Sequence, residues 1–428
     1  MVFLYRLSIT FYHLAIWLAM PFSRKARKWV NGRKGWREDL SVFEPGSQGS
    51  IWLHCASLGE FEQGRPLLEE IRERYPESRI VLTFFSPSGY EVRKSYPHAD
   101  IVCYLPADSP ANARDFLDRI RPRVAIFIKY ELWFFYLKTL HQRQIPVQLV
   151  SAYFPPNHSY TRGLQGRLFK RMLTYLDRVF TQDEASAQTL NQLAGRELAI
   201  ANGDTRFDRV LSIAQGFRPV GGIKSFIGER RCVVAGSTWP ADERPLLEVV
   251  GKTSSDKLCL ILAPHHIGEA HIRQIMERAG SRAVLFSALK EEEPVEKQIL
   301  VIDNIGMLSR LYHYADLCYV GGGFGKGIHN TLEAAVHGKL TLFGPNHERF
   351  REAKGLLACG GAKVVQNAQE LSFWVQAMLN NDAQIEEAGQ RAEDFVAQRT
   401  GATDGVMAYL EEAGLLPEAP QPEMDFSH

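Results

Sequence analysis

Several common patterns are missing from this 428-residue sequence. Its six cysteines are scattered and include no Cys-x-x-Cys pair, which argues against a structural metal site and fits buried free thiols in a reducing compartment. The net charge is only +1, which argues against a nucleic-acid binder that works through bulk electrostatics. No short-period repeat or low-complexity tract occurs. With 45% hydrophobic and 23% charged residues, the length indicates a folded chain of two or three domains.

The first forty residues contain an uncharged apolar stretch that is followed by a run of cations. Residues 7–22 contain no formally charged residue, and this apolar stretch is shorter than the ~20 residues of a spanning helix. A secretory signal would place its cations before the apolar stretch, whereas here they follow it. Only Arg6 precedes the apolar stretch, and seven cations lie between it and the first acid, Glu38: Arg24, Lys25, Arg27, Lys28, Arg33, Lys34 and Arg37.

Residues 1–40 therefore predict an interfacial apolar helix and a basic segment that bind anionic lipid from the cytoplasmic side. The alternative is an ordinary core helix followed by a solvated basic tail.

Beyond residue 40, short apolar runs alternate with helix-like segments, which is typical of a doubly wound parallel α/β sheet. The predicted strands begin near residues 51, 79, 101, 124, 146, 179 and 199. A Gly- and Pro-rich stretch at 210–230 predicts a linker, and strands resume near residues 232, 257, 283, 299, 316 and 339. We predict two Rossmann-like domains, 41–212 and 213–415, facing across a cleft, and a disordered tail at 416–428.

Open α/β sheets bind ligands at the carboxyl ends of their strands, so residues that follow strands are the candidate site. In the first domain, Glu60 lies where the run "IWLHC" gives way to a helix-like segment, and Glu131 follows the run "VAIFI". Glu60 is either a first-turn carboxylate stabilised by the helix dipole or a catalytic group. A helix N-terminus lowers the pKa of such a carboxylate and burial raises it; the sequence leaves this balance open.

In the second domain, Ser237 and Thr238 end a strand and either contact a phosphate or cap the next helix. His265 and His266 end the next strand and offer hydrogen bonds or positive charge to an anion, the alternative being a structural role. The glycine-rich stretch 320–339 contains Gly322 and Gly323, then a predicted helix start from residue 328.

In this stretch Asn330 and Glu333 are suited to phosphate and ribose hydroxyls. No Gly-Lys-Ser/Thr is present here, so it is not a Walker A loop. It does not follow the first strand of its domain, which disfavours an ordinary NAD site. The chain also lacks Asp-x-Asp, which disfavours a metal-dependent diphosphate-sugar enzyme. We expect neither a metal ion nor a cofactor.

These segments, in this order, resemble the 3-deoxy-D-manno-octulosonate (Kdo) transferases, which are membrane-associated glycosyltransferases of the two-Rossmann-domain GT-B type. The matching segments are "HCASLGE" (54–60), "YELW" (130–133), "GDTRFDRV" (203–210), "AGST" (235–238), "APHH" (263–266) and "GGGFGKGIHNTLEAAVHGK" (321–339).

The resemblance implies inverting transfer of Kdo from CMP-Kdo to the lipid A precursor at the cytoplasmic face of the inner membrane, with membrane lipids as partners and no nucleic acid. It implies that Glu60 is the general base and that Glu131 lies on the acceptor side. The implied CMP-Kdo contacts are Arg206, Ser237, Thr238, His265, His266, Gly322, Gly323, Asn330 and Glu333. His265 stands where the family usually has arginine, and Lys129 where it usually has glutamate.

Two other hypotheses remain from the sequence. One is a different GT-B sugar-nucleotide enzyme of the UDP-GlcNAc type, which would share the glycine-rich loop and Glu333 but does not need an apolar N-terminus. The other is a catalytically inactive membrane-bound relative that kept the fold.

Overall fold

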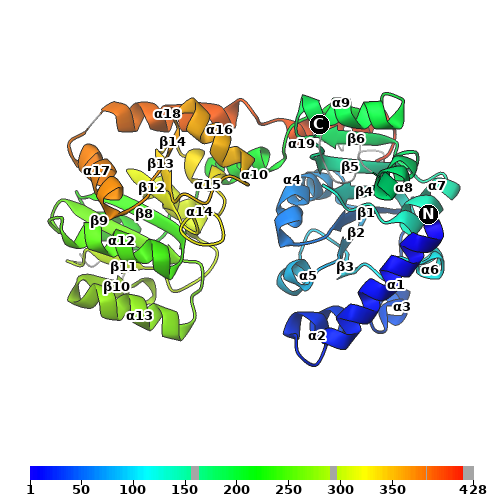
Figure 1. Cartoon of the computed structure of the whole chain (residues 1–428), viewed down its shortest axis with the longest axis horizontal. Helices are drawn as coiled ribbons and strands as arrows, with labels where there is room; N and C mark the ends of the chain where they lie inside the picture. Colours follow the sequence, from blue (N-terminus) through cyan, green and yellow to red (C-terminus); the bar gives the residue numbers. More distant parts are fainter. Residues whose placement is uncertain (156–162, 290–295, 382, 418–428) are drawn as a thin grey trace, which may run out of the picture. The chain divides into compact units, whose positions relative to one another are not determined.

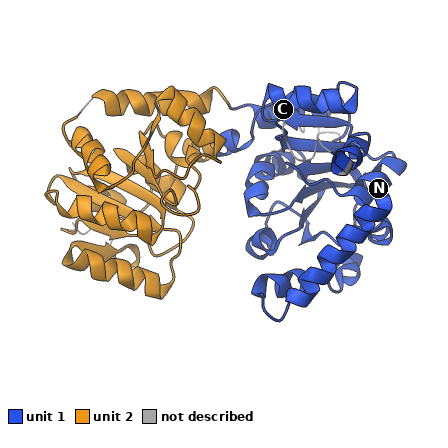
Figure 2. Ribbon diagram, in the orientation of Figure 1, with its two compact units in different colours: residues 1–209, 400–428 blue, residues 210–399 orange. Residues whose placement is uncertain are grey.

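The computed structural model describes residues 1–155, 163–289, 296–381 and 383–417. Residues 1–209 and 400–428 form one compact unit, and residues 210–399 form the other (Figure 2). In the described residues, each unit is built on a parallel sheet of seven strands with helices on both faces (Figure 1). The predicted fold class, α/β with two Rossmann-like domains, is therefore confirmed.

The first unit begins with three helices and then alternates strands with helices. Its elements are α1 (Val2–Ala19), α2 (Arg24–Asn31), α3 (Trp36–Asp39), β1 (Ser50–Cys55), α4 (Leu58–Arg74), β2 (Arg79–Phe84), α5 (Pro87–Arg93), β3 (Ile101–Tyr104), α6 (Pro110–Ile120), β4 (Pro122–Ile128), α7 (Phe134–Gln142), β5 (Val147–Ala152), α8 (Gly163–Leu173), β6 (Arg178–Thr181), α9 (Glu184–Ala194), β7 (Ala199–Ala201), the start of α10 (Arg206–Gln215) and α19 (Ala402–Glu412).

The strand order of this sheet is β3-β2-β1-β4-β5-β6-β7. All residues of β1 are buried, as expected for a parallel strand covered on both faces, and this is why its sequence is apolar rather than alternating. Trp52 packs against Phe116 and Phe127 on one face, while Ile51 and Leu53 belong to the core cluster on the other. The chain changes direction between β1 and β4, which makes the ends of these two strands the switch point of the sheet.

The second unit repeats the same alternation. It contains the rest of α10, α11 (Ile223–Ile227), β8 (Arg231–Thr238), α12 (Pro240–Gly251), β9 (Leu258–Pro264), α13 (Glu269–Ala279), β10 (Ala283–Leu285), β11 (Ile299–Val301), α14 (Leu308–Leu311), β12 (Leu317–Val320), α15 (Leu332–Ala335), β13 (Thr341–Phe343), α16 (Arg351–Cys359), β14 (Ala362–Val364), α17 (Ala368–Leu379) and α18 (Ala383–Ala397). Its strand order is β10-β11-β9-β8-β12-β13-β14, so its switch point lies between β8 and β12.

The structure differs from the sequence-based division at the C-terminal end. The predicted second domain ran to residue 415, whereas α19 belongs to the first unit. Val406, Met407 and Leu410 of this helix are fully buried in the core cluster that contains β1 and α4. The apolar face of α19 therefore decides which unit it joins. The predicted tail at 416–428 lies outside the described residues beyond Pro417, and Leu416 is buried.

The N-terminal helix α1 lies along the first unit and presents an apolar surface outward. Tyr5 packs on Phe134 and Phe135, and two turns later Tyr12 contacts Phe85. By length and composition alone, α1 would also suffice to cross a membrane. Several large apolar side chains of α1 and the turn after it are exposed: Phe3, Leu4, Leu7, Phe11, Leu14, Trp17, Leu18 and Phe22.

Only some of the cations in the basic segment are exposed enough to bind a membrane, so fewer residues can contact lipid than the sequence alone predicts. The Arg33 guanidinium is buried over the Trp29 and Tyr104 rings and donates to the carbonyl oxygens of Phe85 and Leu105. This burial lowers its pKa to about 9. Arg37 pairs with Asp115 and Lys28 with Glu91. Of the seven cations that follow the apolar stretch, the exposed ones are Arg24, Lys25, Arg27, Lys28 and Lys34. Lys28 is exposed although it is also paired with Glu91.

A single buried carboxylate joins α1 to the start of α7. The Tyr5 hydroxyl donates to Asp108 Oδ2 at 2.6 Å, and the same carboxylate accepts the backbone N–H groups of Phe135 and Tyr136. Burial raises the pKa of Asp108 to about 6, and these three hydrogen bonds oppose that rise.

We expect the Tyr5→Phe substitution to loosen α1, because a hydrogen bond to a charged group contributes about 1.5–3 kcal/mol. Hydrogen–deuterium exchange should become faster in residues 2–19 and stay unchanged in β1. Tyr12→Phe is the matched control, since the contact of Tyr12 with Phe85 is made by its ring. Equal exchange in both variants would show that the Tyr5–Asp108 bond does not hold the helix.

Candidate functional site

In the first unit, the two predicted carboxylates lie at the switch point of the sheet. Glu60 is in the first turn of α4, directly after β1, and Glu131 follows β4. Because β1 and β4 are neighbours in the sheet, the structure brings these two residues into electrostatic contact. Lys129, between β4 and Glu131, has a left-handed backbone with φ of 68°. Such strain in a non-glycine residue costs ~1–3 kcal/mol and is typical of functional sites.

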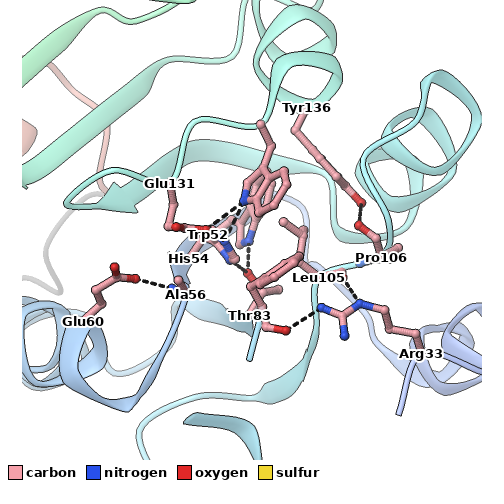
Figure 3. Close-up of polar contacts among 12 residues, drawn as sticks. Arg33, Trp52, His54, Ala56, Glu60, Thr83, Leu105, Pro106, Glu131 and Tyr136 are labelled. Atoms are coloured by element: carbon pink, nitrogen blue, oxygen red, sulfur yellow. Dashed lines mark hydrogen bonds and ion pairs between the residues drawn. The ribbon is translucent and has the colours of Figure 1, made fainter. Parts of the chain in front are cut away.

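The environment of Glu60 answers the question that the sequence left open. Its Oε2 accepts the backbone N–H of Ala56 at 2.6 Å (Figure 3). Burial nevertheless raises the pKa of Glu60 to about 7, and the negative charge of Glu131 adds to the rise. The N–H groups of Ala56 and Ser57 and the charge of Lys129 oppose it. Glu60 is thus both a helix-start carboxylate and a group that exchanges a proton near neutral pH.

Glu131 is held by aromatic side chains from the sheet and the following loop. Trp133 Nε1–H donates to Glu131 Oε2 at 3.0 Å, and His54 Nε2 lies 3.4 Å from the same oxygen. His54 Nδ1 lies 2.8 Å from Thr83 Oγ1, which also accepts the Trp52 indole N–H (Figure 3). The Trp133 Nε1–H also lies 3.2 Å from His54 Nε2, so Trp133, His54 and Glu131 form one hydrogen-bonded cluster.

His54, Thr83 and Trp133 are the site residues that sequence reasoning missed. His54 and Thr83 are fully buried, and buried polar groups are rarely left without a partner. The available signal was a histidine inside an otherwise apolar strand. It shows that a polar group faces the core but does not name the partner, because Thr83 and Glu131 lie 29 and 77 residues away.

Arg206 lies in the first unit, at the start of α10, whereas the other residues of the predicted donor site lie in the second unit. Its guanidinium donates to Asp204 Oδ2 through Nη2 at 2.8 Å, and Asp204 Oδ1 accepts from Gln63 of α4. The Arg206 charge lowers the pKa of the buried Asp204 carboxyl against the effect of burial. This pair holds the start of α10 against α4.

In the second unit, the predicted residues gather at the ends of β8, β9 and β12. Ser237, the second-last residue of the strand β8, has φ of 53°. Gly321 is required beside it: a Cβ at Gly321 would lie 2.4 Å from the Ser237 carbonyl oxygen. Gly322 has φ of 94° and donates its N–H to Asp242 Oδ2 at 2.8 Å, and Gly323 packs on the backbone of Gly344. The loop is fixed by close backbone contacts and by the Asp242 carboxylate.

The histidines form an aromatic stack with Trp239. His265 stacks on both Trp239 and His329, with ring centroids 4.9 and 4.3 Å away, and Trp239 Nε1–H donates directly to His329 Nε2 at 3.0 Å. Burial lowers the pKa of His265, and it lowers that of His329 to about 4 with help from the neighbouring histidines. His329 is therefore neutral at pH 7, and the lowered pKa of His265 disfavours the positive charge considered for it.

Asn330 and Glu333 are brought together, but the expected helix start at residue 328 is wrong. Asn330 Nδ2–H donates to Glu333 Oε1 at 3.0 Å, and Asn330 Oδ1 accepts the N–H of Leu332. The helix α15 begins only at Leu332 and lasts one turn. The preceding residues turn back to the strand end, where the N–H of His329 donates to the Gly321 carbonyl oxygen. A helical row of N–H groups is thus absent from residues 328–331.

Comparison with known proteins agrees with the resemblance seen in the sequence. Residues 34–209 match the family model of the 3-Deoxy-D-manno-octulosonic-acid transferase (kdotransferase). A 3-deoxy-D-manno-octulosonic acid transferase from Bordetella pertussis is 27% identical over 397 residues, which cover 89% of this chain and 90% of the relative. One from Rickettsia felis is 28% identical over 366 residues, covering 83% and 77%.

Among solved structures, the UDP-GlcNAc 2-epimerase from Neisseria meningitidis bound to UDP-GlcNAc is similar in fold. It gives a TM-score of 0.58 at 14% sequence identity and covers 85% of this chain and 100% of that chain. At this identity the likeness concerns the fold alone. Over residues 34–209 by the family model, and over most of the chain by the relatives, the sequence is similar to the 3-deoxy-D-manno-octulosonic acid (Kdo) transferases, which supports a glycosyltransferase.

Proposed function

We propose that this chain transfers Kdo from CMP-Kdo to a hydroxyl of the lipid A precursor (lipid IVA) in lipopolysaccharide core biosynthesis, with inversion at the anomeric carbon. Glu60 acts as the general base. The observation that carries the proposal is a carboxyl at a sheet switch point whose pKa is raised to about 7 by burial. The names and chain coverage of the relatives support the choice of sugar.

The reaction replaces one bond at the anomeric carbon by another. The acceptor oxygen forms a bond to this carbon as the bond to the phosphate oxygen of CMP breaks, and the acceptor proton passes to the Glu60 carboxylate. A base with a pKa near the working pH is best suited to this transfer, which is commonly worth ~10²–10⁴-fold in rate. The Ala56 N–H bonded to Oε2 keeps the carboxylate in a fixed orientation.

The remaining roles follow the elements on which the residues lie. Glu131, which accepts a hydrogen bond from Trp133, contacts the acceptor. Its negative charge also helps to keep the pKa of Glu60 high. In the second unit, Ser237 and Thr238 hold the donor phosphate, because donors that are fixed beforehand stabilise the charge that builds on a leaving phosphate. Gly322, whose N–H is already bonded to Asp242, and Gly323 have no side chain and let the donor approach the backbone closely. His265, His266, Asn330 and Glu333 contact the nucleoside and sugar, and Arg206, which Asp204 holds at the start of α10, contacts the donor phosphate.

The same proposal assigns the chain to the cytoplasmic face of the inner membrane. The exposed apolar side chains of α1 enter the acyl region of one leaflet, and the exposed cations around α2 bind anionic head groups. The contacts of Tyr5 and Tyr12 with the first unit favour a helix that lies on the membrane.

We expect Glu60→Gln to abolish transfer by ~10²-fold or more while leaving CMP-Kdo binding unchanged, because only the proton acceptor is lost. Glu62→Gln, two residues along α4, is the matched control and should keep normal turnover. Single-turnover transfer and calorimetric binding of CMP-Kdo measure the two effects. Normal turnover in Glu60→Gln would exclude Glu60 as the base.

Repeating the assay with UDP-GlcNAc separates the proposal from a UDP-GlcNAc enzyme, and absence of transfer with either donor would indicate an inactive relative.

The fold of this variant is checked by its melting temperature. Burial raises the pKa of Glu60, so its favourable contribution to stability is full below about pH 4.5 and is lost as the pH rises through about 7. At about pH 8 the Glu60→Gln variant should therefore melt no lower than the unsubstituted protein. A large drop would mean that the carboxylate has a structural role in holding Ala56.

The pH dependence of turnover should follow the charges around Glu60. Turnover should rise with pH through about 7, since only the deprotonated carboxylate accepts a proton. The Lys129→Met substitution should move this rise in turnover to higher pH, because the Lys129 charge lowers the pKa of Glu60. The Glu131→Gln substitution should move the rise to lower pH, because the Glu131 charge raises that pKa. The pH–rate profiles of the three proteins test this. A rise that stays in place in both variants would show that another group controls it.

A further inference from the structure

A groove of about 490 Å³ lies in the first unit between α1, the segment 130–133 and α8. This volume falls within the ~300–1,000 Å³ typical of small-molecule sites. Each of the three elements contributes apolar side chains to its wall: Leu4, Ile9, Leu132, Trp133, Leu168 and Met172. The wall also includes the ring of Tyr5, whose hydroxyl is already bonded to Asp108. Walls of this kind accept hydrocarbon and offer few partners to a sugar or a phosphate.

One part of the groove reaches the candidate site. Glu131 lines it, and this carboxylate is fixed by the Trp133 N–H at 3.0 Å. The charge of Glu131 also raises the pKa of Glu60. A molecule in the groove is therefore held beside Glu131, the carboxylate whose charge acts on Glu60.

Another side of the groove is continuous with the exposed apolar surface of α1. Leu4 lines the groove and is 53% exposed, and its neighbours Phe3 and Leu7 are 75% and 40% exposed. An exposed apolar patch of this size on one helix is typical of a surface that contacts lipid or another protein. The groove thus connects a lipid-facing surface with a pair of carboxylates.

We propose that this groove binds one acyl chain of the lipid acceptor and so sets the position of the acceptor hydroxyl at Glu131 and Glu60. The inference rests on the proposed function and adds a residue-level site for the lipid part of the substrate. An acyl chain in a bilayer is already in an apolar surrounding, so the groove adds little affinity. Its effect is on orientation, and misplacement of a reacting group can cost ~10²-fold in rate.

Ser8 provides a position at which the groove can be filled without disturbing the core. Ser8 lines the groove, is exposed, and bonds only within its own helix to the Tyr5 carbonyl oxygen. Thr10 is the matched control: it lies on the same helix, is exposed, bonds to the Arg6 carbonyl oxygen, and is absent from the groove lining.

With a fully acylated lipid A precursor in detergent micelles, Ser8→Trp should reduce kcat/KM at least about tenfold. With the deacylated sugar head group as acceptor, the same variant should keep the activity of the unsubstituted protein, and KM for CMP-Kdo should not change. Thr10→Trp should match the unsubstituted protein on both acceptors. Equal losses on both acceptors in Ser8→Trp, or no loss on either, would overturn the groove assignment.

A second experiment does not depend on activity. A lipid A precursor with a photoreactive diazirine at the end of one acyl chain should label the α8 peptide that contains Leu168 and Met172, and Ser8→Trp should remove this labelling. Labelling confined to α1, as for simple contact with a micelle, would contradict the proposal. Failure of the unsubstituted protein to transfer Kdo to any acceptor would instead refute the proposed function, while labelling of α8 would still support a lipid groove.

Discussion

The structure depends most on the competition between burial and hydrogen bonding at Glu60. A carboxylate in the first turn of a helix normally has its charge stabilised by backbone N–H groups and by the helix dipole. Here the N–H groups of Ala56 and Ser57 are present, yet burial and the nearby charge of Glu131 outweigh them. The result is a carboxyl that is fixed in position and still exchanges a proton near neutral pH. Neither the helix start alone nor burial alone would provide both properties.

Both units use the same local means to build a site at a switch point. In the first unit, Lys129 follows β4 in a left-handed conformation, and in the second, Ser237 adopts one within β8. Lys129 directly follows, and Ser237 lies on, one of the two strands between which its chain changes direction. In the second unit, Gly321 and Gly323 then allow neighbouring backbones to approach more closely than any side chain would permit. Strain that would be unfavourable elsewhere is held in place by a sheet that is buried on both faces.

Much of the fold could be predicted from the sequence because its strands are buried on both faces. Thirteen apolar runs were assigned, and each corresponds to a strand from β1 to β13. The strand β14 was missed since Ala362–Val364 is only three residues long and contains a lysine. The position of α19 could not be read from the sequence either, because an amphipathic helix shows that it packs but not on which unit.

For the candidate site, the sequence predicted which residues lie near the ends of strands, but it did not predict which side chains they contact. Glu60, Glu131, Ser237 and His265 were identified as strand-end residues, and the structure places them at strand ends. The lowered pKa values of His265 and His329 follow from burial and from neighbouring histidines, which spacing along the chain does not reveal. For the same reason the Arg206–Asp204 pair and the His54–Thr83 contact appear only in the folded chain.

The most direct test of the account is a titration of the Glu60 carboxyl itself. Carbon-13 NMR of protein labelled at the glutamate side-chain carboxyl, with Glu60→Gln used to assign the signal, reports its protonation independently of turnover. The account predicts a titration midpoint near 7 in the unsubstituted protein. A midpoint at or below the ordinary value of about 4.5 would contradict it, because the helix-start hydrogen bonds would then outweigh burial and Glu60 would be a weak base.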